Sequence, residues 1–205
     1  MRIRSLLLLL PVTLLMGCAT PSPSPTPTEL ITVTLTPAPT PECASLLTAV
    51  QAQDVALTRS CLQQGEDANQ TDAGGLSVLN YAAASGNVEI VTALLEAGSE
   101  VNYQDPWGMA SLHAALKEGH DAVTLLLLEH GADVNLQTTS GYYVGFTPLH
   151  TAIYFGKAGL ATIEQLLQKG ADVNATNQAR QTPLQMASEK GLTEVEALLI
   201  EYGAK

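Results

Sequence analysis

Aromatic residues are scarce in this chain, which has one Trp, six Tyr and two Phe among its 205 residues. Its apolar residues are mostly Leu, Ala and Val, a balance that suits helices better than the strands of a β-sandwich. Hydrophobic residues make up 46% of the chain, which is ordinary for a folded protein, and the length fits one domain with appendages. We therefore expect a single all-α domain.

Basic residues are also few, with 9 Lys and Arg against 20 Asp and Glu. Arg2 and Arg4 fall in a segment that we expect to be removed, which leaves 7 basic and 20 acidic residues and a net charge of −13. Such a charge repels nucleic-acid phosphates and anionic lipid headgroups. Nucleic-acid binding is therefore disfavoured and a basic protein partner is favoured, unless the charge serves only solubility.

The apolar stretch near the N-terminus runs from Ser5 to Met16 and is too short to span a bilayer as a stable helix. It follows Arg2 and Arg4, and a basic start before a short apolar segment is typical of an export signal. We therefore expect the protein to function outside the cytoplasm.

This segment ends in Leu15-Met16-Gly17-Cys18, which resembles the lipobox of bacterial lipoproteins. The resemblance implies that residues 1–17 are a signal peptide and that Cys18 receives two or three acyl chains, enough to hold a protein on a membrane. We expect a place in the cell envelope, lipid-anchored on the extracytoplasmic side of a membrane, in the periplasm or at the cell surface. The alternative is an ordinary secretory signal with an incidental cysteine.

The next segment, from Ala19 to Glu42, reads ATPSPSPTPTELITVTLTPAPTPE. Its prolines remove backbone donors and block helix formation, and it offers little apolar surface to bury. We interpret residues 18–42 as the lipidated cysteine followed by a disordered tether. In a polyproline conformation the tether would reach on the order of 70 Å.

The rest of the chain contains a repeated pattern in which TPLH, a central Gly and GADVN recur at fixed offsets. The copies are SVLNYAAASGNVEIVTALLEAGSEVN, ASLHAALKEGHDAVTLLLLEHGADVN, TPLHTAIYFGKAGLATIEQLLQKGADVN and TPLQMASEKGLTEVEALLIEYGAK. The pattern resembles the ankyrin repeat, and a degenerate unit precedes these four. The resemblance implies an all-α solenoid over residues 43–205, with hairpin-like finger loops between helix pairs. Its units are at about 44–76, 77–109, 110–146, 147–181 and 182–205.

Each unit also makes physical sense without the resemblance. A Thr, Ser or Ala opens the first helix, where a hydroxyl can cap free amides, and Pro148 and Pro183 suit a first turn. In the second helix, the spacing of Val88, Val91, Leu94 and Leu95 predicts one buried face. Helices this short cannot bury their own faces, so the units must stack.

Two cysteines, Cys43 and Cys61, remain once Cys18 is lipidated. Outside the cytoplasm such a pair is more often oxidised than free. Because Cys43 precedes the first helix and Cys61 lies near the end of its partner, we predict a disulfide that joins them. The alternative is that Cys61 is a buried core thiol.

Candidate catalytic chemistry is weak. His113 and His150 occupy the histidine of the TPLH-like tetrapeptide, where the resemblance implies a structural imidazole that hydrogen-bonds the backbone and the next unit. His130 and Asp133 are too few ligands for a metal site, and no nucleotide-binding loop or nucleophile motif is present. We expect no metal, no cofactor and no enzymatic activity.

Seven of the nine aromatic residues gather in the fingers and on the neighbouring helix ends. One finger, QTTSGYYVGF, carries four extra residues. Exposed aromatic side chains are typical binding anchors, although the long finger could instead use its aromatics as a small core of its own. The hypothetical partner-binding residues are Tyr103, Trp107, Met109, Lys117, Glu118, Tyr142, Tyr143, Phe146, Tyr154, Phe155, Arg180 and Lys190. Arg180 replaces the glycine that the family usually has in this finger.

The sequence as a whole predicts a membrane-tethered, monomeric module for protein–protein interaction that has no catalytic activity. Two alternatives remain open, a structural spacer and an accessory subunit of an envelope enzyme. A hydrolytic enzyme is the least favoured class, because a solenoid of this size rarely encloses a polar pocket.

Overall fold

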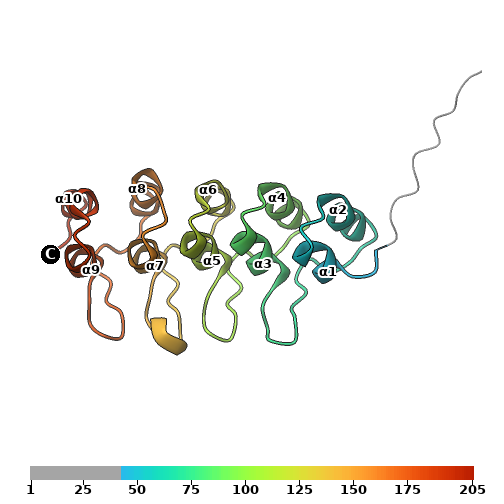
Figure 1. The fold of residues 1–205 in the computed structure, drawn as a ribbon, viewed down its shortest axis with the longest axis horizontal. Coiled ribbons are helices and arrows are strands. Elements are labelled where there is room, and N and C mark those ends of the chain that lie inside the picture. Colours follow the sequence, from blue (N-terminus) through green and yellow to red (C-terminus); the bar gives the residue numbers. More distant parts are fainter. Residues whose placement is uncertain (1–42) are drawn as a thin grey trace, which may run out of the picture. The chain divides into compact units, whose positions relative to one another are not determined.

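The computed structural model describes residues 43–205, so the signal peptide, Cys18 and the tether lie outside the described residues. Within residues 43–205 the chain forms ten α-helices arranged as five stacked pairs, with no named strand (Figure 1). The helices are α1 (Leu46–Gln51), α2 (Val55–Gln63), α3 (Val78–Ser85), α4 (Val88–Glu96), α5 (Ser111–Glu118), α6 (Asp121–Glu129), α7 (Pro148–Phe155), α8 (Leu160–Gln168), α9 (Pro183–Glu189) and α10 (Thr193–Glu201). This arrangement is the all-α repeat solenoid that the sequence predicts.

The odd-numbered helices form one layer and the even-numbered helices a second, and we call them inner and outer helices (Figure 1). The fingers are the loops of residues 70–76, 103–109, 136–146 and 175–181, which extend from the inner layer. The longest of them contains a short 3₁₀ helix, η1 (Gly141–Tyr143). None of the helices within residues 43–205 is long and apolar enough to cross a membrane.

Capping side chains start the inner helices where the sequence predicts. The hydroxyls of Ser77, Thr147 and Thr182 each accept a hydrogen bond from a backbone N–H in the first turn of the helix that follows. Pro148 and Pro183 occupy the first helical position, where no donor is needed. The starts of α3, α7 and α9 are therefore encoded locally, whereas α5 begins at Ala110 without a side-chain cap.

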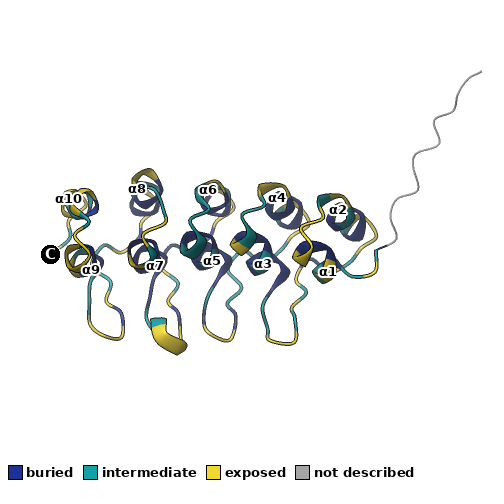
Figure 2. Ribbon diagram, in the orientation of Figure 1, coloured by how far each residue is buried: buried dark blue, intermediate teal, exposed yellow. Residues whose placement is uncertain are grey.

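The core lies between neighbouring pairs and is built from aliphatic side chains (Figure 2). In α4 the buried residues include Ile90, Val91 and Leu94, whereas Val88 is 39% exposed. The expected burial of Val88 is wrong because the buried face is centred on Ile90. Val88 comes two positions before Ile90, and positions i and i+2 of an α-helix point about 200° apart around the helix axis. Val88 therefore faces the solvent.

Asparagines link successive units. Asn102 accepts a hydrogen bond through Oδ1 from the backbone N–H of Asp133 (2.8 Å), and its Nδ2 donates to the carbonyl of Gly131 (3.2 Å). Asn135 and Asn174 repeat both contacts in the following units. Each loop that closes an outer helix is thereby tied to the next.

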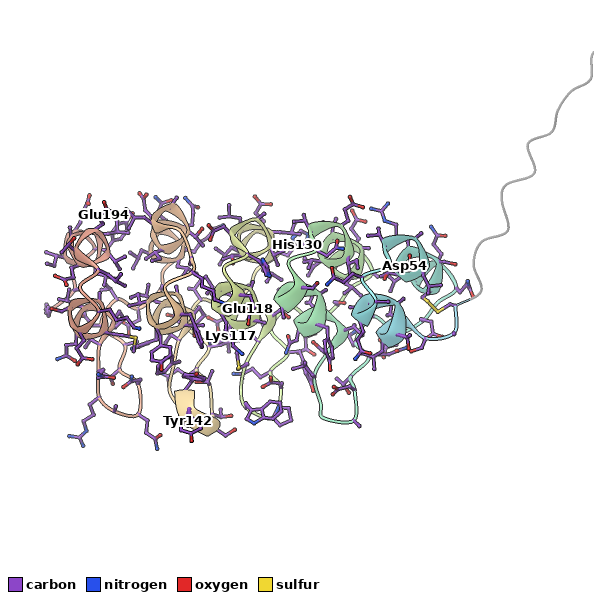
Figure 3. The ribbon with its side chains drawn as sticks, viewed as in Figure 1. Asp54, Lys117, Glu118, His130, Tyr142 and Glu194 are labelled. Carbon is purple, nitrogen blue, oxygen red and sulfur yellow. A yellow bond between two sulfur atoms is a disulfide. The ribbon has the colours of Figure 1, made fainter. Side chains whose placement is uncertain are left out.

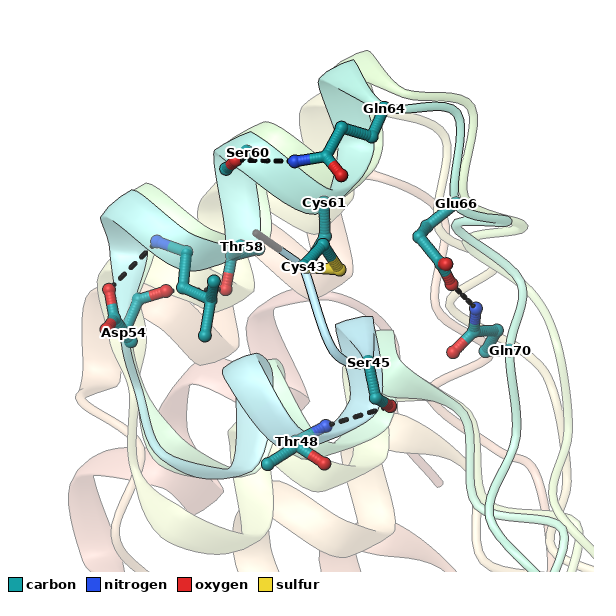
Figure 4. Close-up of a disulfide and its surroundings, with 11 residues drawn as sticks. Cys43, Ser45, Thr48, Asp54, Thr58, Ser60, Cys61, Gln64, Glu66 and Gln70 are labelled. Carbon is teal, nitrogen blue, oxygen red and sulfur yellow. Dashed lines mark hydrogen bonds between the residues drawn. A yellow bond between two sulfur atoms is a disulfide. The ribbon is translucent and has the colours of Figure 1, made fainter. Parts of the chain in front are cut away.

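A disulfide joins Cys43 to Cys61, with 4.9 Å between their Cα atoms (Figure 4). Cys61 lies in α2 and is fully buried, while Cys43 precedes α1 and packs against the core. The bond therefore connects the chain before the first helix to the outer helix of the first pair.

Candidate protein-binding surface

The fingers and the neighbouring side of α3, α5, α7 and α9 form one surface, which we call the inner face. Three grooves run along it and share their walls. The Trp107 groove, about 310 Å³, is lined by Leu76, Asn80, Ala84, Asp105, Trp107, Met109, Ala114, Lys117 and Glu118. The middle groove, about 220 Å³, lies between Trp107 and Tyr142, and the Tyr142 groove, about 280 Å³, lies between Tyr142 and Gln181. The grooves thus include residues from all four fingers.

Two aromatic side chains on this face are open to solvent. Tyr142, in the 3₁₀ helix of the long finger, is 99% exposed, and Trp107, on the preceding finger, is 50% exposed. Figure 3 shows Tyr142 at the far end of its finger, away from the helices. Large exposed aromatics at the edges of a groove are typical anchors for a protein partner.

The other aromatics of this region form a cluster. The ring centroid of Tyr143 lies 5.4 Å from that of Phe146, 5.3 Å from that of Tyr154 and 5.4 Å from that of Phe155. Phe146 is only 6% exposed, because its ring holds the long finger on α7, and it also lines the Tyr142 groove. The long finger therefore has a small core of its own, and it also presents Tyr142.

Lysine side chains lie over the edge of this aromatic cluster. Lys190 Nζ is 4.7 Å from the ring centroid of Tyr154, and Lys117 Nζ is 5.9 Å from that of Phe155. Glu118 follows Lys117 in the chain (Figure 3) and accepts a hydrogen bond from Lys157 at 2.9 Å, and this contact holds the pKa of the Glu118 carboxyl below its usual value. Cation–aromatic contacts are thus a recurrent feature of the inner face.

Comparison with known families agrees with this architecture. The family described as ankyrin repeats (3 copies) matches residues 46–138 and again residues 137–205. The chain belongs to the ankyrin-repeat family. Repeats of this family generally mediate protein–protein interaction and are generally not enzymes.

A relative with a shorter match is the ankyrin repeat protein YahD of Escherichia coli (strain K12). It is 40% identical over 65 residues, which are 30% of this chain and 32% of YahD. The matched region thus spans about a third of each protein.

The two histidines of the TPLH-like tetrapeptides, His113 and His150, are buried and contact the backbone of the next unit. His113 Nε2 lies 3.3 Å from the carbonyl oxygen of Phe146, and His150 Nε2 lies 3.1 Å from that of Gln181. Burial lowers the pKa of His113 to about 4 and also lowers the pKa of His150. These imidazoles position the bases of two fingers.

The remaining predicted residues differ in their surroundings. The Tyr103 hydroxyl donates to the carbonyl of Gly75 at 3.0 Å and so connects two ankyrin fingers. Met109 is part of the wall of the Trp107 groove. Arg180 adopts a left-handed φ of 60°, so this finger keeps the glycine-type turn at some cost in strain.

No metal-binding group is found among the described residues. His130 Nδ1 lies 2.9 Å from the carbonyl oxygen of Leu126 in its own helix, so one ring nitrogen already faces the local backbone.

Sequence reasoning missed five residues of the Trp107 groove, which are Leu76, Asn80, Ala84, Asp105 and Ala114. A signal was present in the repeat, because Ala114 occupies the position that Tyr81 holds one ankyrin unit earlier. A small residue where the neighbouring unit has a large one leaves a hollow in an otherwise regular surface.

Proposed function

We propose that this ankyrin-repeat chain is a non-catalytic module that holds a protein partner on its inner face. The observation that carries the proposal is the exposure of Trp107 and Tyr142 on adjacent fingers, on either side of the middle groove. A spacer would have no use for exposed aromatics at a groove. A partner would bury both, and such residues contribute much of the binding energy of protein interfaces.

Catalysis is poorly supported by the inner face. The buried imidazoles of His113 and His150 already face backbone carbonyls of the next unit, and their lowered pKa values favour the neutral form. We therefore place the protein among binding modules. If it serves an enzyme, it does so as an accessory subunit.

We also propose that the module is lipid-anchored through Cys18 on the extracytoplasmic side of a membrane. The lipobox-like Leu15-Met16-Gly17-Cys18 supports this, and so does the Cys43–Cys61 disulfide, since such bonds persist mainly outside the reducing cytoplasm. Cys18→Ala should release the protein from the membrane fraction and abolish the mass added by the lipid. An unmodified Cys18 in native protein would refute the anchor.

A crosslinking pull-down from envelope extracts tests the binding function. It compares the unmodified protein with a Trp107→Ala, Tyr142→Ala double variant. Tyr143 is left unchanged, because its ring is part of the core of the long finger and its loss would disturb the fold. Leu125→Ala, Leu160→Ala is the matched control, because both residues are exposed on outer helices. We expect the control to capture the partner and the aromatic variant to lose it. Equal capture by all three would refute the proposal.

A further inference from the structure

Two aspartates hold the same position in successive fingers, Asp72 before α3 and Asp105 before α5. Each shapes its finger through Oδ1. Asp72 accepts from the backbone N–H groups of Gly74 and Leu76, at 2.8 Å each, and Asp105 accepts from those of Trp107 and Met109, at 2.9 and 2.8 Å.

The second carboxyl oxygen distinguishes the two fingers. The hydroxyl of Tyr81 donates to Asp72 Oδ2 at 2.7 Å. One unit later Ala114 stands at the position of Tyr81, and among residues 43–205 the hydrogen bonds to the Asp105 side chain both go to Oδ1, which leaves Oδ2 without the partner that Tyr81 gives Asp72. Asp105 is only 6% exposed, so most of its surface is shielded from water. What remains accessible of Asp105 opens into a groove, so a hydrogen-bond donor brought into that groove by a ligand would stabilise the carboxylate.

The hollow left by the missing phenol is the Trp107 groove, which both Asp105 and Ala114 line. Its walls also contain the indole of Trp107, the carboxyl of Glu118, which is paired with Lys157, and the side chain of Lys117. A ligand group that suits these walls carries hydrogen-bond donors for Asp105 and a flat, positively charged surface for the indole. The arginine guanidinium has both properties.

We propose that the Trp107 groove binds an arginine side chain of the partner protein. The proposal rests on the binding function above and specifies its chemistry. A chain with net charge −11 attracts a basic partner. Lys117 and Lys190 already lie over Phe155 and Tyr154, whereas no cation of residues 43–205 lies over Trp107. The partner's arginine supplies that contact and the donor that Asp105 lacks.

Trp107 is the one tryptophan of the chain, so its fluorescence reports on this groove directly. The purified full-length protein is titrated with N-acetyl-L-arginine amide and, separately, with the citrulline analogue, which has nearly the same shape and no charge. We expect a saturable fluorescence change with arginine, with a dissociation constant on the order of 1 mM, the range for a ligand of this size. Citrulline should bind at least about tenfold more weakly, because it lacks the charge that carboxyl and indole recognise.

Two variants test the assignment within the groove. Asp105→Asn removes the charge but keeps an oxygen that can accept from the backbone of the finger. Asn177 accepts from Gln181 N–H in this way in another finger. Ala114→Tyr restores the phenol of the preceding unit and fills the hollow. Each should weaken arginine binding at least about tenfold, the effect of losing one charge-assisted contact. The control is Asp72→Asn, which changes the same position in the finger where Tyr81 is present.

The proposal is overturned by equal binding of arginine and citrulline, by no saturable arginine binding, or by unchanged binding in both groove variants. Circular dichroism of each variant confirms that it is folded. If the unmodified protein captures a partner through Trp107 and Tyr142 but binds no arginine, the binding function stands and the arginine site alone is wrong. If nothing is captured but arginine binds as expected, the site stands without the larger function.

Discussion

Asn102 binds the next ankyrin unit at two points, since its Oδ1 accepts from Asp133 N–H and its Nδ2 donates to the Gly131 carbonyl. The contact recurs along the solenoid and ties the outer edge of each unit to its neighbour. In a stacked array each unit contacts only its neighbours, so these links contribute directly to the coupling between units.

Asn102→Ala should therefore lower the free energy of unfolding by about 1 to 2 kcal/mol, the contribution of two partly exposed hydrogen bonds. Urea unfolding followed by circular dichroism measures the change. Gln137→Ala is a suitable control, because Gln137 is exposed and its side chain makes no hydrogen bond in the described part of the chain. A loss no larger than that of the control would contradict the role of the asparagines.

The Cys43–Cys61 disulfide should stabilise the first unit in particular. The two cysteines are 18 residues apart in sequence, and closing a loop of this length contributes about 3 kcal/mol in the chain-entropy model. Reduction should raise amide hydrogen exchange in α1 and α2 more than in α9 and α10. Cys43→Ala, which leaves buried Cys61 in place, should behave like the reduced protein, whereas uniform exchange along the array would contradict this assignment.

The buried histidines predict a loss of stability in acid. Because burial lowers the pKa of His113 from 6.5 to about 4, the unfolded chain binds more protons than the folded chain between these values. The free energy of unfolding should be unaffected by His113 above pH 6.5 and should fall as the pH drops from 6.5 to about 4. The expected loss is about 3 kcal/mol, since one pKa unit corresponds to about 1.4 kcal/mol.

His113→Asn tests this, because Asn80 occupies the same position in the preceding unit and donates to the Met109 carbonyl. Urea titrations at several pH values should show a flatter dependence in the variant. An unchanged slope between pH 4 and 6.5 would show that other groups cause the acid sensitivity.

The aromatic residues of the long finger should differ in how much they contribute to stability. Phe146→Ala should lower the free energy of unfolding by about 3 to 5 kcal/mol, because it removes a buried ring from the Tyr143 cluster. Tyr142→Ala should change it by less than about 0.5 kcal/mol, because the side chain is almost wholly exposed. Thermal and chemical unfolding of both variants measure the difference, and equal costs would contradict the division.

Much of the solenoid could be predicted from the sequence because its determinants are local. A Thr-Pro pair before an apolar stretch predicts the start of a helix, as at Thr147 and Pro148. A glycine that follows such a stretch predicts its end, as Gly119 does. The recurrence of these signals at a nearly constant spacing predicts the stacking of units. The sequence places Val88 on the buried face and the structure exposes it, because a short apolar helix offers two nearly equivalent faces and packing against the neighbours selects one.

The candidate site could be predicted only in part. The gathering of aromatics in the fingers is visible in the sequence, but which of them pack together depends on the path of the four-residue insertion. Tyr142 and Tyr143 are adjacent, yet one is exposed and the other lies in the cluster. The unpartnered oxygen of Asp105 depends on a contact between a finger and a helix, so it emerges from the folded chain.

The most direct test of the central claim is site-specific photocrosslinking in living cells, with a photoreactive amino acid at position 142 or at position 160. Both side chains are exposed, Tyr142 on the inner face and Leu160 on an outer helix. A binding module that works through its inner face predicts a discrete crosslinked protein from position 142 and none from position 160. Crosslinks from position 160 alone, or none from position 142, would contradict it.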